Sequence, residues 1–598
     1  MRNWKVLTVL VLAALAALQY SSVPRSLWEY DECWFAMAVE HYQPLLHHPP
    51  PPGSPVFLAA AKLFAPFSSS PFHAMLVTSI LAVAVGLVAF VFAFREVSGS
   101  LPAALVGTAV LYASPAVLVS GTLPQADSGA LALFGVAIWA CARGNPLVMA
   151  LASAAAIGWR PQFSVAVLPM FLAAVMLELR TWRDRVNSLT AFTIGCLAWL
   201  VPMVVACGGT EGFWKWMAGQ AAYYAKHDAH LSRSGYSRGH IALRFLAHPW
   251  GPKWLSLPLL FVAATAGVVV ARANGLFATR SERLRKLLPL GIGAAAYLAF
   301  ALATMDPADA VRYAIPGLPF VAVLAGIAIT SIPFEALPVA ATVGYVAGAY
   351  LYALPVIRTR ATSIAPPVAA AAWIRTHVPR NAVVLYDMPL RPHAEYLLRG
   401  WQVMHTDTGL RRYATDVTVP LVLFIDGESR DAGGVTFRWP DTDAYRKLTR
   451  QHYGAVSAVP LPPSERFRVI RDVHAPERTR EGKAWRWVGA HGVIELPDSG
   501  ATHARLTFRT PPEYPFDEIR VRIGEATVTL RRNETKDVTV PLTSQRIEIE
   551  PEKTFVPARV PGSNNRDQRT LSVMLTRVQQ LAAPAAPPPM PAAPLQRQ

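Results

Sequence analysis

The chain has 598 residues, of which 53% are hydrophobic and 16% are charged, and its formal net charge is +17. Ordinary soluble domains carry about 25% charged residues, so this composition predicts that much of the surface does not face water. It excludes a disordered or collagen-like chain, and four cysteines are too few for a small disulfide-bonded scaffold. Cys33 and Cys207 remain a candidate pair, whereas Cys141 and Cys196 lie in apolar runs.

Apolar stretches close to the length of a membrane-spanning helix follow one another up to about residue 357, and none recurs beyond about residue 360. An alternative for residues 1–20 is a cleaved signal peptide, because residues 1–5 are basic and the apolar core is short. The sequence predicts about eleven spans, at residues 6–21, 74–94, 101–120, 128–142, 146–159, 162–178, 188–207, 254–272, 287–304, 313–332 and 335–356.

Basic residues collect in alternate loops, which indicates the orientation, because short loops rich in Lys and Arg stay in the cytoplasm. Arg95, Arg143, the arginines of 180–185 and the basic run of 280–286 all fall on the same side as residues 1–5. The segments expected outside are 22–73, 121–127, 208–253, 305–312 and everything after 357. We therefore expect a multi-pass protein of the bacterial inner membrane with a periplasmic or extracellular C-terminal part.

The C-terminal part changes its pattern along the chain. Within 362–475, short apolar runs at 382–386 and 421–425 alternate with helical patterns, which predicts a small α/β domain. Within 480–581 the apolar residues recur with a period of two between turn residues, which predicts a β-sandwich. Residues 582–598 are rich in Ala and Pro, so we expect a disordered tail.

Acidic residues gather at the exterior ends of the predicted spans. Glu29, Asp31 and Glu32 follow the first span, Asp127 starts the fourth, and Asp306 and Asp309 precede the tenth. Ionisable groups beside a membrane span are functional candidates when several converge on one side. The alternative is that they are ordinary charges in loops that face water.

The first exterior loop, 22–73, contains a run of four prolines after His47 and His48. Prolines cannot continue a helix, so the run would hold the backbone extended beside the membrane. By residue type, His41, His47 and His48 together with Asp31 and Glu32 could form a metal site, although their spacing is not diagnostic. Packing or hydrogen-bonding histidines are the preferred interpretation.

Five segments stand in order within residues 1–357: Asp31-Glu32 with Phe35, His48-Pro49-Pro50, Asp127, Gly158-Trp159-Arg160-Pro161, and residues 312–319 (RYAIPGLP). This ordered set resembles the GT-C superfamily of integral membrane glycosyltransferases, in particular the branch of protein O-mannosyltransferases and the lipid A aminoarabinose transferase, and residues 312–319 are similar to the family's Arg-Tyr-x-x-Pro-x-x-Pro segment. The departures are Phe35 where Tyr is frequent and the lack of an Arg before Asp127.

The distal strands carry a second resemblance. Residues 485–487 (WRW), 494–497 (IELP) and 567–573 (DQRTLSV) are similar to a carbohydrate-binding-like sandwich often appended to bacterial members of this superfamily. Ser572 stands where that closing segment usually has Gly.

The resemblance implies a GT-C fold and the transfer of a sugar from a polyprenyl-phosphate donor to an exterior hydroxyl of a glycan, lipid or protein, with inversion. Transfer to a hydroxyl needs a carboxylate base, and the departing phosphate needs cations. The expected catalytic residues are Asp31 as general base, Glu32 to orient it or contact the sugar, and Asp127. Arg312, Arg160 and Lys226 are expected to bind the donor phosphate, and His48, Phe35 and Tyr313 to support the first loop.

No metal ligand or certain cofactor is assigned, and dependence on a divalent cation stays open. The alternatives are a transporter or flippase of lipid-linked glycans and a scaffolding protein that works through its sandwich. A nucleic-acid partner is not expected, because much of the positive charge lies in predicted cytoplasmic loops that face anionic lipid.

Overall fold

The computed structural model describes residues 2–227, 237–273, 282–334, 336–429, 433–449, 454–478, 484–561, 565 and 567–581. The chain divides into two compact units. The first consists of Met1–Ala365 with Pro440–His452, and the second consists of Pro366–Trp439 with Tyr453–Gln598. The predicted disordered tail, 582–598, lies outside the described residues.

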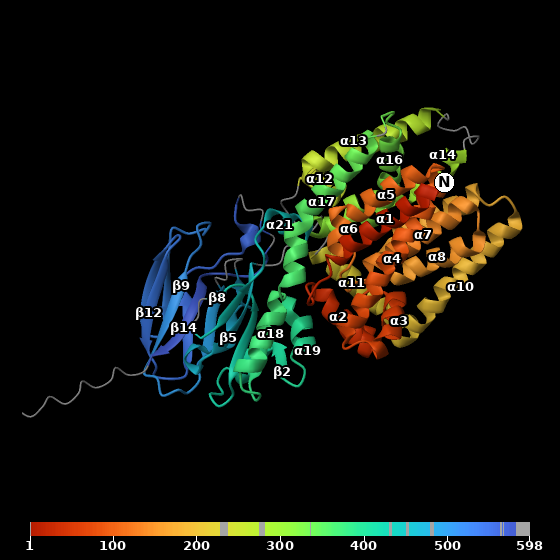
Figure 1. Cartoon of the computed structure of the whole chain (residues 1–598). Coiled ribbons are helices and arrows are strands. Elements are labelled where there is room, and N and C mark those ends of the chain that lie inside the picture. The colour runs from red at the N-terminus through yellow and green to blue at the C-terminus, as the bar shows by residue number, and fades with distance from the viewer. Residues whose placement is uncertain are drawn as a thin grey trace, which may run out of the picture. The chain divides into compact units, whose positions relative to one another are not determined.

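The first unit is helical, and every predicted span is helical in it (Figure 1). The span predicted at 101–120 is two helices, because Pro115 starts a new helix whose N-cap is Ser114. The helices that correspond to the predicted spans are α1 (Arg2–Tyr20), α4 (Pro71–Ser98), α5 (Leu101–Ala113), α6 (Pro115–Ser120), α7 (Asp127–Arg143), α8 (Pro146–Trp159), α9 (Ser164–Leu177), α10 (Trp182–Ala206), α13 (Lys253–Ala273), α14 (Glu282–Thr304), α16 (Leu318–Thr330) and α17 (Ala336–Thr362).

Among the described residues, five helical segments are long and apolar enough to cross a membrane: Pro71–Ser98, Trp182–Ala206, Lys253–Val270, Arg285–Thr304 and Ala336–His377. A sixth candidate is a pair, Pro307–Tyr313 and Ile315–Thr330, which is bent by 42°. Several other predicted spans are apolar helices of 10–17 residues, shorter than the ~20 residues that a straight crossing needs. The composition and these helices identify a membrane protein.

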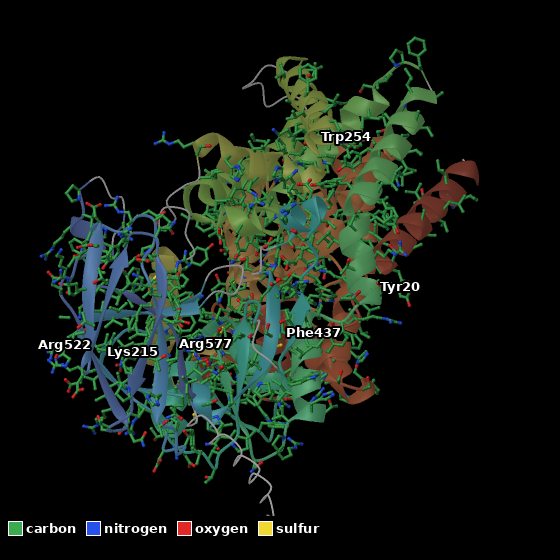
Figure 2. All side chains as sticks on the ribbon, turned by 90° about the vertical axis from the view of Figure 1, so that its left-hand side faces the viewer. Tyr20, Lys215, Trp254, Phe437, Arg522 and Arg577 are labelled. Carbon is green, nitrogen blue, oxygen red and sulfur yellow. The ribbon has the colours of Figure 1, made fainter. Side chains whose placement is uncertain are left out.

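The outer helices expose apolar side chains that water would not favour. Ile194 and Val205 on α10 are 60% and 70% exposed. Exposed faces of this kind fit contact with lipid. Tyr20 ends α1 and Trp254 lies in the first turn of α13, and both rings are largely exposed (Figure 2), as is typical of aromatic residues at a membrane interface.

The first loop folds into α2 (Tyr30–Glu40), a short turn and α3 (Pro55–Phe64). The four prolines form a turn between them instead of one extended bracket, with cis peptide bonds at His48-Pro49 and Pro51-Pro52. Gln43 and His48 pair through their backbones just before this turn. The four cysteines, all within the described residues, are free thiols.

The second unit begins with α18 (Pro366–His377) and a five-stranded sheet in the order β2-β1-β3-β5-β4. Strand β1 pairs in parallel with β2 and β3, whereas β5 is antiparallel to β3 and β4. Its elements are β1 (Val383–Tyr386), α19 (Arg391–Leu397), β2 (Gln402–His405), α20 (Thr406–Tyr413), β3 (Leu421–Asp426), β4 (Val435–Arg438) and β5 (Ala455–Leu461). Between β4 and β5, the segment Pro440–His452 with α21 (Asp443–Leu448) belongs to the helical unit.

A second sheet of nine strands follows, in the order β11-β10-β13-β8-β14-β9-β12 with β6 and β7 on β8. Alternate residues of these strands point into one buried core, for example Ile519 and Val521 of β10 and Leu506 and Phe508 of β9. The strands are β6 (Arg468–Val473), β7 (Glu477–Arg478), β8 (Ala484–Glu495), β9 (His503–Arg509), β10 (Glu518–Ile523), β11 (Ala526–Arg531), β12 (Thr535–Pro541), β13 (Arg546–Pro551) and β14 (Met574–Leu581).

This sheet starts earlier than the predicted boundary between 475 and 480. Strand β6 lies within the range expected for the α/β domain, yet it pairs with β8 of the second sheet. The boundary therefore falls between β5 and β6. Local periodicity does not indicate which sheet a short strand joins, because that depends on its distant partner.

Gly129 lets α7 and α8 approach closely. A Cβ at this position would overlap the ring of Trp159, the residue before Arg160. We expect Gly129→Ala to lower the free energy of unfolding by about 1–3 kcal/mol, because a well-packed core resists added volume. Thermal unfolding of the purified protein in detergent measures the change.

Gly344→Ala in α17 is the matched control, because a Cβ there meets nothing within 4 Å. Alanine is favoured over glycine inside a helix by roughly 0.5–1 kcal/mol, so this variant should be as stable as the wild type or slightly more stable. Equal stability of both variants would contradict the close packing at Gly129.

Candidate active site

The centre of the site is the carboxylate of Asp127, which two arginines share. Asp127 starts α7 and is 2% exposed. Its Oδ2 accepts from Arg312 Nε at 3.0 Å, and its Oδ1 forms an ion pair with Arg160. Arg160 is the C-cap of α8, and Arg312 lies in the short helix α15 (Ala310–Tyr313). One carboxylate therefore fixes the ends of two helices and the bend that precedes α16.

The two arginines are themselves held by further groups. Arg160 donates from Nε to Gln162 at 3.0 Å, and Arg312 Nη1 lies 3.8 Å from Asp309 Oδ2. A buried charge is expensive unless it is paired, so the cluster is stable only as a whole. Removing one partner of a buried pair typically costs about 3–5 kcal/mol.

Asp31 lies at the edge of this cluster. It is in the first turn of α2, its side chain is partly exposed, and it interacts electrostatically with Arg312. Within the described ranges, no hydrogen bond or ion pair to Asp31 is found. Tyr297 of α14 also lies within electrostatic range of Asp127, Arg160 and Arg312. The structure thus brings together four predicted site residues, Asp31, Asp127, Arg160 and Arg312.

Glu32, the neighbour of Asp31, is completely buried and points into the protein. Its Oε2 accepts from the backbone N–H groups of Trp28 at 2.6 Å and Glu29 at 3.1 Å, and Gln125 donates to its Oε1 at 3.3 Å. Burial, reinforced by the Glu29 carboxylate, raises the pKa of Glu32 to about 8. These contacts cap α2 and leave no exposed surface of Glu32 to contact a sugar.

A second buried arginine, Arg360, connects the start of α2 with distant segments. It is 2% exposed; its Nη2 donates to Glu29 Oε1 at 2.8 Å and its Nη1 to the Val119 carbonyl at 2.8 Å. Its own carbonyl accepts from the Arg25 N–H, and its guanidinium bonds to Tyr445 of α21. Glu29 is the N-cap of α2, so Arg360 anchors the helix that carries Asp31.

The sequence analysis does not assign Arg360, Glu29, Tyr297 or Tyr445. For Arg360 a signal exists: it is a basic residue just beyond the exterior end of the last predicted span. Glu29 carries the same signal as Asp31 and Glu32, an acidic residue directly after the first span, whereas Tyr297 and Tyr445 carry no local signal, because their partners are far away along the chain.

The residues expected to support the first loop have structural contacts. Phe35 is buried and packs edge-on against Phe57, which in turn contacts Trp159. His48 takes part in the backbone pairing before the proline turn, and Tyr313 interacts electrostatically with Arg312.

Two further predicted candidates are Asp306 and Lys226. Asp306 caps a short turn by accepting from the Ala308 N–H at 2.9 Å. The side chain of Lys226 lies outside the described residues.

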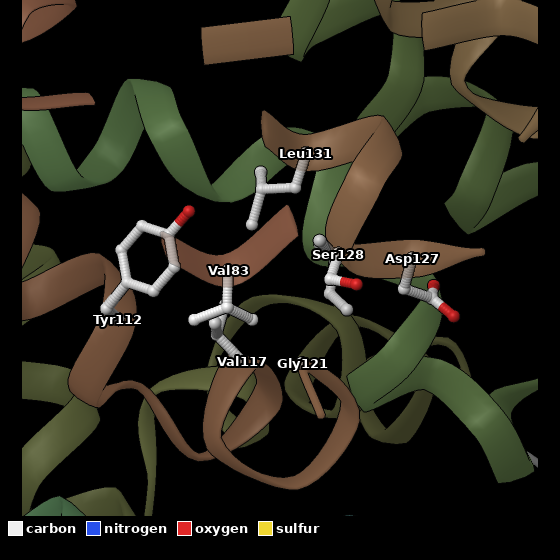
Figure 3. A pocket seen from close by; sticks show the side chains of 8 residues that line it. Val83, Tyr112, Val117, Gly121, Asp127, Ser128 and Leu131 are labelled. Atoms are coloured by element: carbon white, nitrogen blue, oxygen red, sulfur yellow. The ribbon is translucent and has the colours of Figure 1, made fainter. Parts of the chain in front are cut away.

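Asp127 also borders a small apolar cavity, which is lined by residues of α4, α5, α6 and α7 (Figure 3). Asp127 and Ser128 lie on one side, and Tyr112 lies on the other (Figure 3). Its volume of about 10 Å³ is close to the space of one water molecule, so it does not hold a sugar.

Comparison with known proteins gave no match to a family model and none to a curated protein. Among solved structures, the chain is similar to ArnT from Cupriavidus metallidurans, with 14% identity over 76% of this chain and 98% of that one and a TM-score of 0.48. It is similar to the Archaeoglobus fulgidus oligosaccharyltransferase, with 9% identity over 96% of this chain and 97% of that one and a TM-score of 0.49. It is also similar to the mycobacterial arabinofuranosyltransferase AftD, with 11% identity over 98% of this chain and 59% of that one and a TM-score of 0.45.

These structures are GT-C glycosyltransferases, the superfamily that the motifs predict. Their TM-scores are below 0.5 and their identities below 15%, so the functional argument rests on the residues of the site.

Proposed function

We propose that this protein is a membrane glycosyltransferase that moves a sugar from a polyprenyl-phosphate-linked donor to an acceptor hydroxyl. The observation that carries the proposal is the arrangement of Asp31. Its carboxylate is partly exposed and lies beside a buried cluster whose two arginines are fixed by Asp127. A general base needs a carboxylate that a substrate can reach, and a phosphate leaving group needs fixed cations.

In this reaction the acceptor oxygen attacks the anomeric carbon while the bond from that carbon to the phosphate oxygen breaks. Asp31 takes the proton of the acceptor hydroxyl. The polyprenyl phosphate leaves with the electron pair of the broken bond, and Arg312 and Arg160 stabilise its negative charge. Because one base suffices and the attack is direct, the configuration at the anomeric carbon inverts.

Asp127 would act by holding the arginines and not by touching the sugar. Its two oxygens are already engaged by Arg312 and Arg160, and it is almost fully buried. Glu32 would act through its cap on α2, which sets the position of Asp31. The two residues would be positioning residues, and Asp31 would be the catalytic one.

The lipid-linked donor follows from the proposed sidedness. The loop with Asp31 is expected on the exterior of a bacterial inner membrane, and nucleotide sugars are made in the cytoplasm. A donor carried by a membrane lipid reaches such a site. One of the similar structures, ArnT, was solved bound to undecaprenyl phosphate. The α/β and sandwich regions, 362–475 and 480–581, would lie on the same exterior side, where the acceptor is.

We expect Asp31→Asn to lower sugar transfer by about 10²–10⁴-fold, because the amide cannot accept the acceptor proton. Transfer of label from a panel of polyprenyl-phosphate sugars to membrane acceptors measures the rate. Binding of undecaprenyl phosphate should stay close to that of the wild type, since Asp31 is not among the groups proposed to hold the phosphate.

Glu211→Gln is the matched control, because Glu211 is an exposed carboxylate in α11 (Thr210–His227) paired only with Lys215 among the described residues. It should keep wild-type transfer. Transfer by Asp31→Asn within a few-fold of the wild type would exclude Asp31 as base. No transfer by the folded wild type from any donor would favour the flippase alternative.

We expect Arg312→Lys to weaken binding of undecaprenyl phosphate and to lower transfer by at least about tenfold. Lysine keeps the charge, but it cannot bond to Asp127 and to a phosphate with the fixed geometry of a guanidinium. Arg183→Lys, at an exposed position of α10, should leave both quantities unchanged. Unaltered phosphate binding by Arg312→Lys would contradict the assigned role.

We expect Glu29→Gln to lower kcat by about tenfold while binding of undecaprenyl phosphate stays near the wild-type value. The change weakens the anchor of α2 and so displaces Asp31, but it leaves Asp127 and its arginines in place. Arg360→Gln should act in the same way and add little to Glu29→Gln, because both remove the same contact. Fully additive losses of kcat would contradict a shared role.

A further inference from the structure

Three side chains on two neighbouring strands of the second sheet converge away from the site described above. His491 lies on β8, and Glu548 and Glu550 lie on β13. These strands are antiparallel, with Glu548 opposite Val493 and Ile549 opposite Gly492, which brings Glu550 next to His491. Residues two apart on a strand share one face, so the imidazole projects between the two carboxylates.

The distances do not fit hydrogen bonds. His491 Nε2 lies 3.6 Å from Glu548 Oε2 and 3.7 Å from Glu550 Oε1, and the three ligand atoms all lie within 4.8 Å of one another. A good N–H···O bond would be 2.7–3.2 Å long. Ligand atoms that surround a tetrahedral metal at about 2.1 Å are roughly 3.4 Å apart, which is close to the spacing seen here.

The imidazole nitrogen is buried and has no hydrogen-bond partner in the described part of the chain. The backbone N–H of the same residue donates to Asp472 Oδ2 at 2.8 Å, which fixes the strand at this point. A buried imidazole nitrogen between two carboxylates, without a hydrogen-bond partner among the described residues, is placed as a metal ligand would be.

The surrounding charges suit a cation. Arg522 of β10 forms an ion pair with Glu550 through Oε2, the oxygen that faces away from His491. Arg522 is on the outer surface of the sheet (Figure 2). It orients the carboxylate as a supporting partner does in many metal sites, and one negative charge remains on the cluster when His491 is neutral.

We propose that His491, Glu548 and Glu550 bind a divalent transition-metal ion of the Zn²⁺ class. An imidazole with two carboxylates suits Zn²⁺ better than Ca²⁺ or Mg²⁺, which take oxygen ligands. Three protein ligands leave a fourth position for water or for a ligand oxygen. The bound ion joins β8 to β13 at the middle of the sheet.

The test is titration of the untagged full-length chain, purified in detergent and stripped with EDTA, with ZnCl₂ in a calorimeter. We expect His491→Ala and Glu550→Gln to lose one equivalent of bound Zn²⁺ or to weaken that site at least tenfold. Glu548→Gln, at a more exposed position, gives a third variant if either of these fails to fold.

His503→Ala and Glu518→Gln are matched controls on exposed positions of β9 and β10, outside the cluster. They should bind the same number of Zn²⁺ ions as the wild type. X-ray absorption spectra at the zinc edge of the wild type should show one imidazole nitrogen with oxygen ligands. Equal stoichiometry and affinity in His491→Ala and the wild type would overturn the site, and would leave the trio as an ion pair that forms when His491 is protonated.

Discussion

The helical unit depends on a single buried carboxylate. Burying the charge of Asp127 would strongly destabilise the fold if the carboxylate were unpaired. Arg160 and Arg312, from two distant segments of the chain, form ion pairs with it. Those arginines in turn cannot be buried without Asp127. The ends of α7 and α8 and the bend before α16 are therefore fixed with respect to one another, and Gly129 removes the side chain that would keep α7 from Trp159. The position of the site follows from this constraint.

Two aspartates with the same chemistry have different surroundings, and the roles proposed for them follow from that difference. Asp127 is saturated by guanidinium groups, so it has no capacity left to take a proton from a substrate. Asp31 is on the first turn of α2, and its carboxylate is partly open. A substrate can therefore reach this carboxylate, as the proposed general base requires.

The sequence predicts the convergence of Asp31, Asp127, Arg160 and Arg312 because each lies beside an apolar segment and the alternation of basic loops places all four on one side. It also predicts the helical character of each span. It does not predict that Glu32 is buried as a cap, because that depends on Gln125, which follows four further helices, α3 to α6. The assignment of β6 to the second sheet and the grouping of His491 with Glu548 and Glu550 depend on strand register, which local periodicity leaves open.

The contacts of Arg360 revise where the functional part of the chain ends. A boundary at 357, drawn where the last apolar stretch stops, would exclude Arg360 and with it the anchor of Glu29. It would also exclude α21, whose Tyr445 bonds to the same guanidinium although it lies between two strands of the α/β sheet. The start of α2 is thus held by residues from the end of the last long helix and from an insertion some eighty positions further on. A chain that stopped after the apolar segments would keep Asp127 and its arginines but would lose Arg360 and Tyr445, which hold the start of α2, so the proposed position of Asp31 depends on the segment Pro440–His452.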